Sequence, residues 1–254
     1  MKLSHQTFGT GQPIVILHGL FGSADNWRSL AKQLATQALV ITVDLRNHGR
    51  SPHCSEQTYA LMSDDLVQLL QELNLKKVDI MGHSIGGKVA MDFSLRYPQW
   101  LRRMVVVDIA PKQYPDEHSA IFKALLAINL SLYSSRNQVD NALKLALPNK
   151  AVRQFLLMNL NLNGEQLDWR INLQALYDNY PEFLAAVCES EASLIPSCFI
   201  RGGQSNYISS EDEDLIKSRF PLAQLTTIKN AGHWVHADAP QQFLTTITEF
   251  FDYA

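Results

Sequence analysis

The chain has 254 residues, with 22 basic and 25 acidic side chains and a formal net charge of −3. This length is enough for one large α/β domain, or one domain with an insertion, to bury a full core. Neither sign of charge forms a long block, whereas a nucleic-acid surface usually needs a basic stripe, so we expect no nucleic-acid partner.

Short apolar runs alternate with segments of helical periodicity along most of the chain. Continuous apolar strands of this kind are typical of a parallel sheet that is covered on both faces. Apolar residues recur at helical spacing from Tyr59 to Leu73, which predicts an amphipathic crossover helix. The expected fold class is therefore α/β, with a doubly wound, mostly parallel open sheet. Its predicted strands are residues 13–19, 38–44, 76–82, 103–110, 197–203 and 223–230.

One stretch breaks this alternation, because it offers only helix-like segments before the strand pattern resumes. We expect residues 1–110 and 195–254 to form the core domain, and residues 111–194 to form a helical cap inserted after the strand that ends at Asp108. Ligands in such sheets bind at the carboxyl ends of the strands. A cap at this point would lie over the site.

The sequence shows no targeting or membrane-spanning signal. No leader of basic then apolar residues precedes the first strand-like segment, and no apolar run approaches the length that spans a bilayer. Cys54, Cys188 and Cys198 lack the C-x-x-C spacing of zinc sites and an even number for disulfides. We expect a cytoplasmic protein that does not insert into membranes.

Residues 81–89, MGHSIGGKV, allow two interpretations. A phosphate loop would run from Gly82 to Lys88, but it needs Ser or Thr after the lysine to bind magnesium, and that position is Val89. The alternative is G-x-S-x-G, the sharp strand-to-helix turn that presents a nucleophilic serine. Positions two before and two after the serine crowd each other in that turn, and both are glycine. The sequence favours Ser84 as a nucleophile.

Two backbone N–H groups are expected to bind an oxyanion next to this serine. The helix that begins near Ile85 directs its free N–H groups and its positive dipole end toward the site. The second donor should come from the loop HGLFGS, residues 18–23, after the first parallel strand. We expect the N–H of Leu20, with Phe21 as the neighbour that competes for this role.

The general base is predicted to be His233, because it lies in a loop after the last strand, in the chain order of this fold type. His236 forms an H-x-x-H pair with it but has no third ligand of suitable spacing, so we expect no metal and assign His236 to packing. His83 is expected to point to the opposite side of the turn, with a structural role. The sequence indicates no cofactor.

The acid departs from the commonest pattern, since Ser205 occupies the loop position where an aspartate is usual. Asp212 and Asp214 follow too late and look like the acidic first turn of a helix. Neighbouring parallel strands lie ~4.8 Å apart, so Asp108, after the next strand, can reach a histidine placed over the serine. We predict that Asp108 orients His233, and that Ser205 either adds a fourth hydrogen-bonding member or only caps its own turn.

The segments VDLRNHGRSP, MGHSIGGKVAM, VVVDIAP and AGHWVHADAP together resemble the α/β-hydrolase superfamily, and within it the YbfF-type esterases. The resemblance places the family's nucleophile, acid, loop serine and histidine on Ser84, Asp108, Ser205 and His233. It implies a carboxylesterase or thioesterase that hydrolyses short to medium acyl esters and acyl-CoA thioesters in the cytoplasm.

The apolar residues Phe21, Phe155 and Trp234 are the predicted substrate contacts. Two rival functions use the same residues: a carbon–carbon bond hydrolase or lyase, and a hydrolase-fold protein that only captures a ligand. The physiological substrate and the oligomeric state carry no signal in the sequence.

Overall fold

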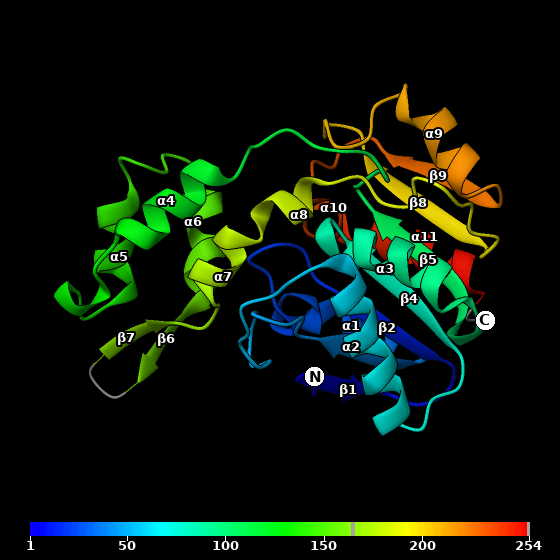
Figure 1. The fold of residues 1–254 in the computed structure, drawn as a ribbon, viewed down its shortest axis with the longest axis horizontal. Helices are drawn as coiled ribbons and strands as arrows, with labels where there is room; N and C mark the ends of the chain where they lie inside the picture. Colours follow the sequence, from blue (N-terminus) through cyan, green and yellow to red (C-terminus); the bar gives the residue numbers. More distant parts are fainter. Residues whose placement is uncertain (164–165, 253–254) are drawn as a thin grey trace.

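A computed structural model describes residues 1–163 and 166–252. Its centre is a seven-stranded sheet in the order β1-β3-β2-β4-β5-β8-β9 (Figure 1). All neighbouring strands are parallel except β1 and β3, which run antiparallel. The strands are β1 (His5–Phe8), β2 (Pro13–Leu17), β3 (Leu39–Val43), β4 (Val78–His83), β5 (Leu101–Val107), β8 (Ser197–Gly202) and β9 (Ala223–Ile228).

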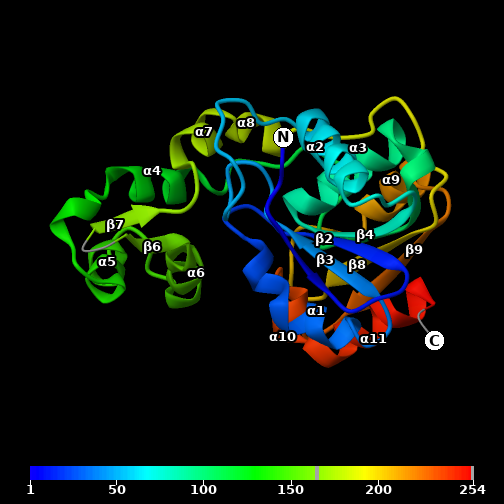
Figure 2. The same cartoon turned by 90° about the horizontal axis from the view of Figure 1, so that it is seen from below.

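Helices cover both faces of this sheet (Figure 2). Along β2, Ile14 and Ile16 pack in the cluster on one face, whereas Val15 and Leu17 pack in the cluster on the other. A strand buried on both faces must be apolar throughout, which is why the six predicted strands could be read from the sequence. The helices of one face are α1 (Arg28–Leu34), α10 (Val235–Asp238) and α11 (Pro240–Phe251), and those of the other are α2 (Tyr59–Glu72), α3 (Ile85–Arg96) and α9 (Asp212–Arg219).

Strand β1, the edge strand at the start of the chain, is not among the strands predicted from the sequence. This strand has only four residues, HQTF, and most of them are half-buried. It pairs with β3 from His5, opposite Val43, to Phe8, opposite Val40. A short edge strand exposes one side to solvent, so it carries neither a continuous apolar run nor a strict alternation.

The segment between β5 and β8 forms the cap and projects from one end of the core (Figures 1 and 2). The expectation of an all-helical insertion was wrong, because β6 (Leu160–Asn163) pairs with β7 (Gln166–Trp169) in a small antiparallel sheet. Leu and Asn alternate along β6, as expected for a strand with one apolar face. This segment has only four residues, too few for the alternation to be recognised in the sequence. The cap helices are α4 (Ser119–Ala127), α5 (Arg136–Leu143), α6 (Lys150–Leu156), α7 (Leu173–Asp178) and α8 (Tyr180–Leu184). The exact domain boundaries stay a prediction.

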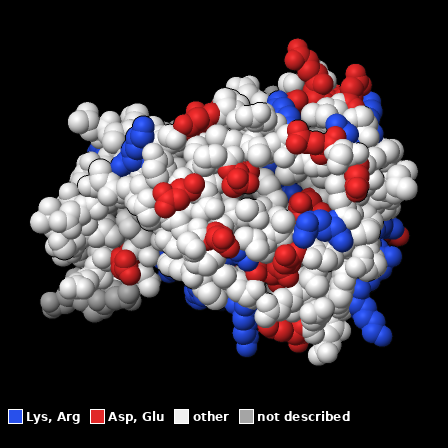
Figure 3. Space-filling view, viewed as in Figure 1, with Lys and Arg blue, Asp and Glu red and all other residues white. Residues whose placement is uncertain are grey.

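Within the described ranges, no helix combines the length and the apolar character that crossing a bilayer requires. Acidic and basic side chains are interspersed on the core face seen in Figure 3, without a continuous stripe of one sign.

A buried lysine on α3 joins the core to both connections of the cap. Lys88 donates hydrogen bonds from Nζ to the backbone oxygens of Lys112, at 2.9 Å, and Ala185, at 2.5 Å. Its ammonium group also lies 4.9 Å from the centre of the Tyr114 ring. Burial lowers the pKa of Lys88 to about 7. The charged form is therefore disfavoured in the folded protein and retained in the unfolded chain.

This difference predicts how stability depends on pH. Above pH 7 the unfolded chain binds a proton at Lys88 that the folded protein has released, so stability rises with pH until the lysine of the unfolded chain also titrates. Lys88→Met removes this contribution. The free energy of unfolding in urea, wild type minus variant, should increase by about 2 kcal/mol between pH 7 and pH 9.

The matched control is Lys77→Met, since Lys77 is exposed. The difference in the free energy of unfolding between wild type and Lys77→Met should stay constant from pH 7 to pH 9. If the difference in the free energy of unfolding between wild type and Lys88→Met also stays constant with pH, Lys88 titrates as an ordinary lysine and the prediction is wrong.

Candidate active site

Ser84 occupies a strained turn between β4 and α3. Its backbone has φ of 53° and ψ of −122°, a conformation that is costly for any residue with a side chain. A Cβ atom at Gly82 would lie 2.1 Å from the oxygen of Gly86, and one at Gly86 would lie 2.6 Å from the oxygen of His18. Only glycine fits at both positions, as the sequence predicted. The turn places the Ser84 side chain at the carboxyl end of the sheet, where it is buried and lines a cavity.

Two backbone N–H groups beside this serine come from different segments. In the part of the chain that the structure describes, the N–H groups of Leu20 and Ile85 make no intramolecular hydrogen bond. Both residues line a cavity that also touches Ser84. The structure therefore brings Leu20 and Ile85 together beside Ser84, and their role as oxyanion donors stays a prediction.

A buried histidine holds the loop that carries Leu20. The N–H of Leu45 donates to Nε2 of His18 at 3.0 Å, so the ring proton lies on Nδ1, which donates to the oxygen of Gly19 at 2.8 Å. Burial lowers the pKa of His18 to about 4, and the ring stays neutral near pH 7. Both ring nitrogens are then satisfied in a single tautomer.

The next residue in this loop, Phe21, has a positive φ of 60°. Its carbonyl oxygen accepts a hydrogen bond of 2.7 Å from Nδ2 of Asn159, a cap residue. Phe21 lines the large cavity but not the smaller one beside Ile85, whereas Leu20 lines both. The shared lining favours Leu20 over Phe21 as the oxyanion donor. The hydrogen bond from Asn159 shows that the cap helps to fix the loop of residues 18–23. Asn159 could not be predicted from the sequence, because its partner is 138 positions away.

Asp108 follows β5 and has no exposed surface. Its Oδ1 atom accepts the N–H of Gly202 at 2.9 Å, and its Oδ2 atom accepts both Nδ1–H of His233 at 2.8 Å and the hydroxyl of Ser205. The structure thus brings together Asp108, His233 and Ser205, which the sequence predicted as one group. Asp212 instead forms an ion pair with Lys112, with 2.7 Å between its Oδ2 atom and the lysine Nζ.

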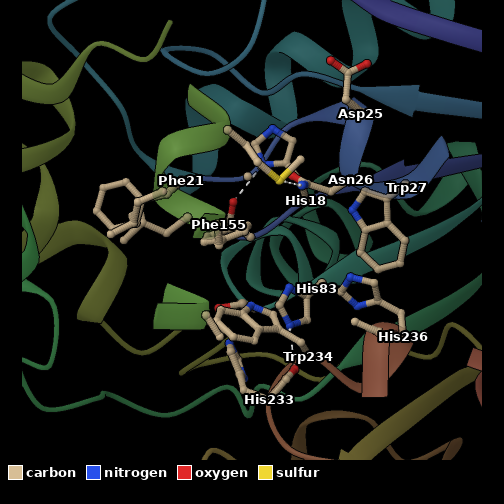
Figure 4. Close-up of a pocket in the computed structure, with 18 of the residues that line it drawn as sticks. His18, Phe21, Asp25, Asn26, Trp27, His83, Phe155, His233, Trp234 and His236 are labelled. Atoms are coloured by element: carbon tan, nitrogen blue, oxygen red, sulfur yellow. Dashed lines mark hydrogen bonds between the residues drawn. The ribbon is translucent and has the colours of Figure 1, made fainter. Parts of the chain in front are cut away.

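His233 is held on two sides besides its contact with Asp108. The Tyr207 ring stacks on the imidazole with centroids 3.9 Å apart, and Nε2 of His83 lies 2.9 Å from the backbone oxygen of His233. His83 was expected to point away from the site, and this was wrong: its ring is buried and lines the cavity (Figure 4). Burial lowers the pKa of His83 well below its ordinary value, so the ring is neutral and donates to the carbonyl. No local sequence pattern predicts the contact of Tyr207 with His233.

Ser84 and His233 both line a cavity of about 720 Å³ between the core and the cap. Ser84 Oγ makes no hydrogen bond with the described residues, so the side chain is available to a ligand. Phe21, Phe155 and Trp234, the predicted substrate contacts, all line this cavity (Figure 4). The rings of Phe155 and Trp234 lie 5.4 Å apart, so they join the cap to the loop of residues 229–234, which carries His233 and is called the histidine loop below.

His236 stacks on Trp27 with ring centroids 4.1 Å apart, which agrees with the packing role expected of it. Burial lowers the pKa of His236 to about 4, and the ring stays neutral. In residues 1–163 and 166–252 there is no group of three or more His, Cys, Asp or Glu side chains that could hold a metal ion.

Comparison with known proteins agrees with this geometry. Residues 12–240 match the model of the alpha/beta hydrolase fold family. The chain is 40% identical to the sn-1-specific diacylglycerol lipase ABHD11 of Mus musculus over 245 residues, which cover 93% of this chain and 80% of the relative. It is 37% identical to the esterase YbfF of Escherichia coli over 241 residues, which cover 94% of this chain and 93% of that one.

Among solved structures, a marine microorganism esterase superimposes with a TM-score of 0.95 at 37% identity, covering 98% of this chain and 99% of the other. The predicted α/β-hydrolase fold is confirmed. These relatives are esterases and lipases, and they support an ester hydrolase. The chain belongs to the α/β-hydrolase family and is a YbfF-type esterase.

Proposed function

We propose that the protein hydrolyses short to medium acyl esters through an acyl-enzyme on Ser84. The single observation that carries this proposal is the hydrogen-bonded group Ser205–Asp108–His233, whose histidine lines the same cavity as Ser84 on its strained turn. A buried carboxylate fixes the histidine tautomer with its proton on Nδ1, which leaves Nε2 free to accept a proton.

In the first half of the reaction, Nε2 of His233 removes the proton of Ser84 Oγ, and the oxygen attacks the acyl carbonyl. The negative charge forms on the carbonyl oxygen, next to the N–H groups of Leu20 and Ile85. Among the described residues these donors have no other partner, so they bind the oxyanion without first breaking a bond. His233 then gives its proton to the alcohol oxygen, which leaves.

In the second half, His233 takes a proton from water, and the resulting hydroxide attacks the acyl-serine. The tetrahedral intermediate uses the same two N–H groups, and Ser84 leaves with the proton returned by His233. The imidazolium formed in each half is stabilised by Asp108, whose Oδ2 lies 2.8 Å from Nδ1. The bond from Ser205 to the same oxygen holds the carboxylate in this orientation.

The printed names of the relatives, a diacylglycerol lipase and an esterase, support lipophilic esters as the substrate class. The apolar walls formed by Phe21, Phe155 and Trp234 support the same class. Activity on acyl-CoA thioesters and a cytoplasmic location, which the sequence resemblance implied, stay predictions.

Replacing Ser84 by Ala removes the nucleophile while leaving the turn in place. The kcat for p-nitrophenyl acetate should fall by about 10⁴-fold or more, because no other hydroxyl can form the acyl-enzyme. Steady-state release of p-nitrophenol measures this. The control is Ser29→Ala, an exposed serine at the cavity wall, which should keep near wild-type turnover. Near wild-type turnover by Ser84→Ala would contradict the assignment.

Asp108→Asn keeps the shape of the acid but favours the wrong histidine tautomer, so kcat should fall by about 10⁴-fold. The matched control is Asp212→Asn, whose carboxylate pairs with Lys112 and does not contact His233. Activity measured on the same ester should be retained in that control. The reverse pattern, an active Asp108→Asn and an inactive Asp212→Asn, would mean that the acid is misassigned.

A further inference from the structure

A second, smaller cavity also opens on Ser84. It holds about 40 Å³ and lies where the start of α3 meets α8 of the cap. The large cavity, of about 720 Å³, lies on the side of the histidine loop. Ser84, Leu20 and His118 line both cavities, so the two spaces meet at the serine and at one of its oxyanion donors.

The histidine determines which part of an ester enters which cavity. The alcohol oxygen must receive its proton from Nε2 of His233, so the alcohol leaves on the side of that residue. His233, together with Trp234 and His236, lines the large cavity, and none of these three lines the small one. The acyl chain lies on the opposite side of the carbonyl carbon, and there the small cavity is the space beside Ser84.

We propose that the small cavity binds the acyl chain and the large cavity binds the alcohol, which makes the enzyme selective for short-chain acyl esters of long, uncharged alcohols. This inference rests on the serine mechanism proposed above and narrows the acyl range proposed there to short chains. A space of 40 Å³ holds about three water-sized groups. An acetyl to butanoyl chain fits there, and a hexanoyl chain does not.

The walls of the small cavity are fixed by hydrogen bonds and burial. The hydroxyl of Tyr180 accepts the N–H of His118 at 3.0 Å and lies 3.1 Å from Nδ1 of the same residue. The hydroxyl of Tyr114 donates to the oxygen of Tyr207 at 2.6 Å. Phe183 is buried against the same space. A longer acyl chain would have to break these contacts, so the cavity sets an upper limit on acyl length.

The large cavity suits an alcohol without charge. Its lining contains no Lys or Arg side chain among the described residues, and its carboxylate, Asp25, pairs with Arg50 at 3.1 Å and Arg170 at 3.4 Å. The phosphates of coenzyme A would need cationic partners, so this cavity favours an uncharged alcohol over coenzyme A, in contrast to the acyl-CoA substrates that the sequence resemblance implies. The apolar rings of Trp27 and Phe155 instead favour a hydrocarbon chain.

Two isomeric esters test the assignment, because they have the same composition and differ only in which side of the ester is long. Hexyl acetate places six carbons in the alcohol, and ethyl hexanoate places six carbons in the acyl chain. Proton release in a pH-stat gives kcat/KM for each. The wild type should prefer hexyl acetate by at least about tenfold, the discrimination that a few methylene groups provide in a closed pocket.

Enlarging the small cavity should reverse this preference. Phe183→Ala should raise the ratio of ethyl hexanoate to hexyl acetate kcat/KM by about tenfold or more. Ile109→Ala, on the core side of the same space, should move the ratio in the same direction and does not depend on how the cap tolerates a change. The matched control is Leu145→Ala, an exposed cap residue that lines neither cavity, and it should leave this ratio unchanged.

The outcomes separate the two proposals. Hydrolysis of p-nitrophenyl acetate together with equal rates on the isomers, or a preference for ethyl hexanoate, would overturn the assignment of the cavities and leave the serine mechanism standing. A ratio that Phe183→Ala and Ile109→Ala leave unchanged would also overturn it. No hydrolysis of any of these esters would contradict the proposed function itself.

Discussion

The Asp108 carboxylate is the interaction on which the site depends. Its two oxygens join the end of β5 to the N–H of Gly202, to Ser205 and to His233, from three further positions in the chain. A buried charge is stable only when such donors satisfy it, so the same bonds that make Asp108 tolerable also set the position of the imidazole. The parallel sheet supplies the geometry, because it ends its strands side by side at one edge.

Around this carboxylate, the site is built from neutral, rigid parts. Burial lowers the pKa of His18 to about 4 and keeps the His83 ring neutral, and each ring donates a hydrogen bond to the backbone of a site loop. The cap adds a further restraint through Asn159, which binds the oxygen of Phe21. The loops that carry His233 and Leu20, the proposed oxyanion donor, are therefore held in place before substrate arrives, and such preorganisation supplies most of the catalytic effect of sites of this kind.

Much of this was predictable from the sequence, and the reasons are physical. Buried parallel strands are continuously apolar, and the turn at Ser84 requires glycine at Gly82 and Gly86. Each of these features can therefore be recognised from one short stretch of the sequence. The stacking of Tyr207 on His233 and the bond from Asn159 join segments far apart in the chain, and neither leaves a local pattern. The orientation of the His83 side chain was predicted wrongly, because it depends on the hydrogen bond from His83 to the backbone oxygen of His233, a residue far away in the chain. Strands β1 and β6 are four residues long, too short for their periodicity to be read.

The central claim is that Ser84 is the nucleophile, and stoichiometric labelling tests it most directly. The protein would be titrated with a fluorophosphonate, with peptide mapping by mass spectrometry and residual esterase activity followed in the same samples. The account predicts one label per chain, located on Ser84, with activity lost in proportion to labelling. Full labelling of Ser84 with activity retained, or inactivation with the label on another residue, would contradict it.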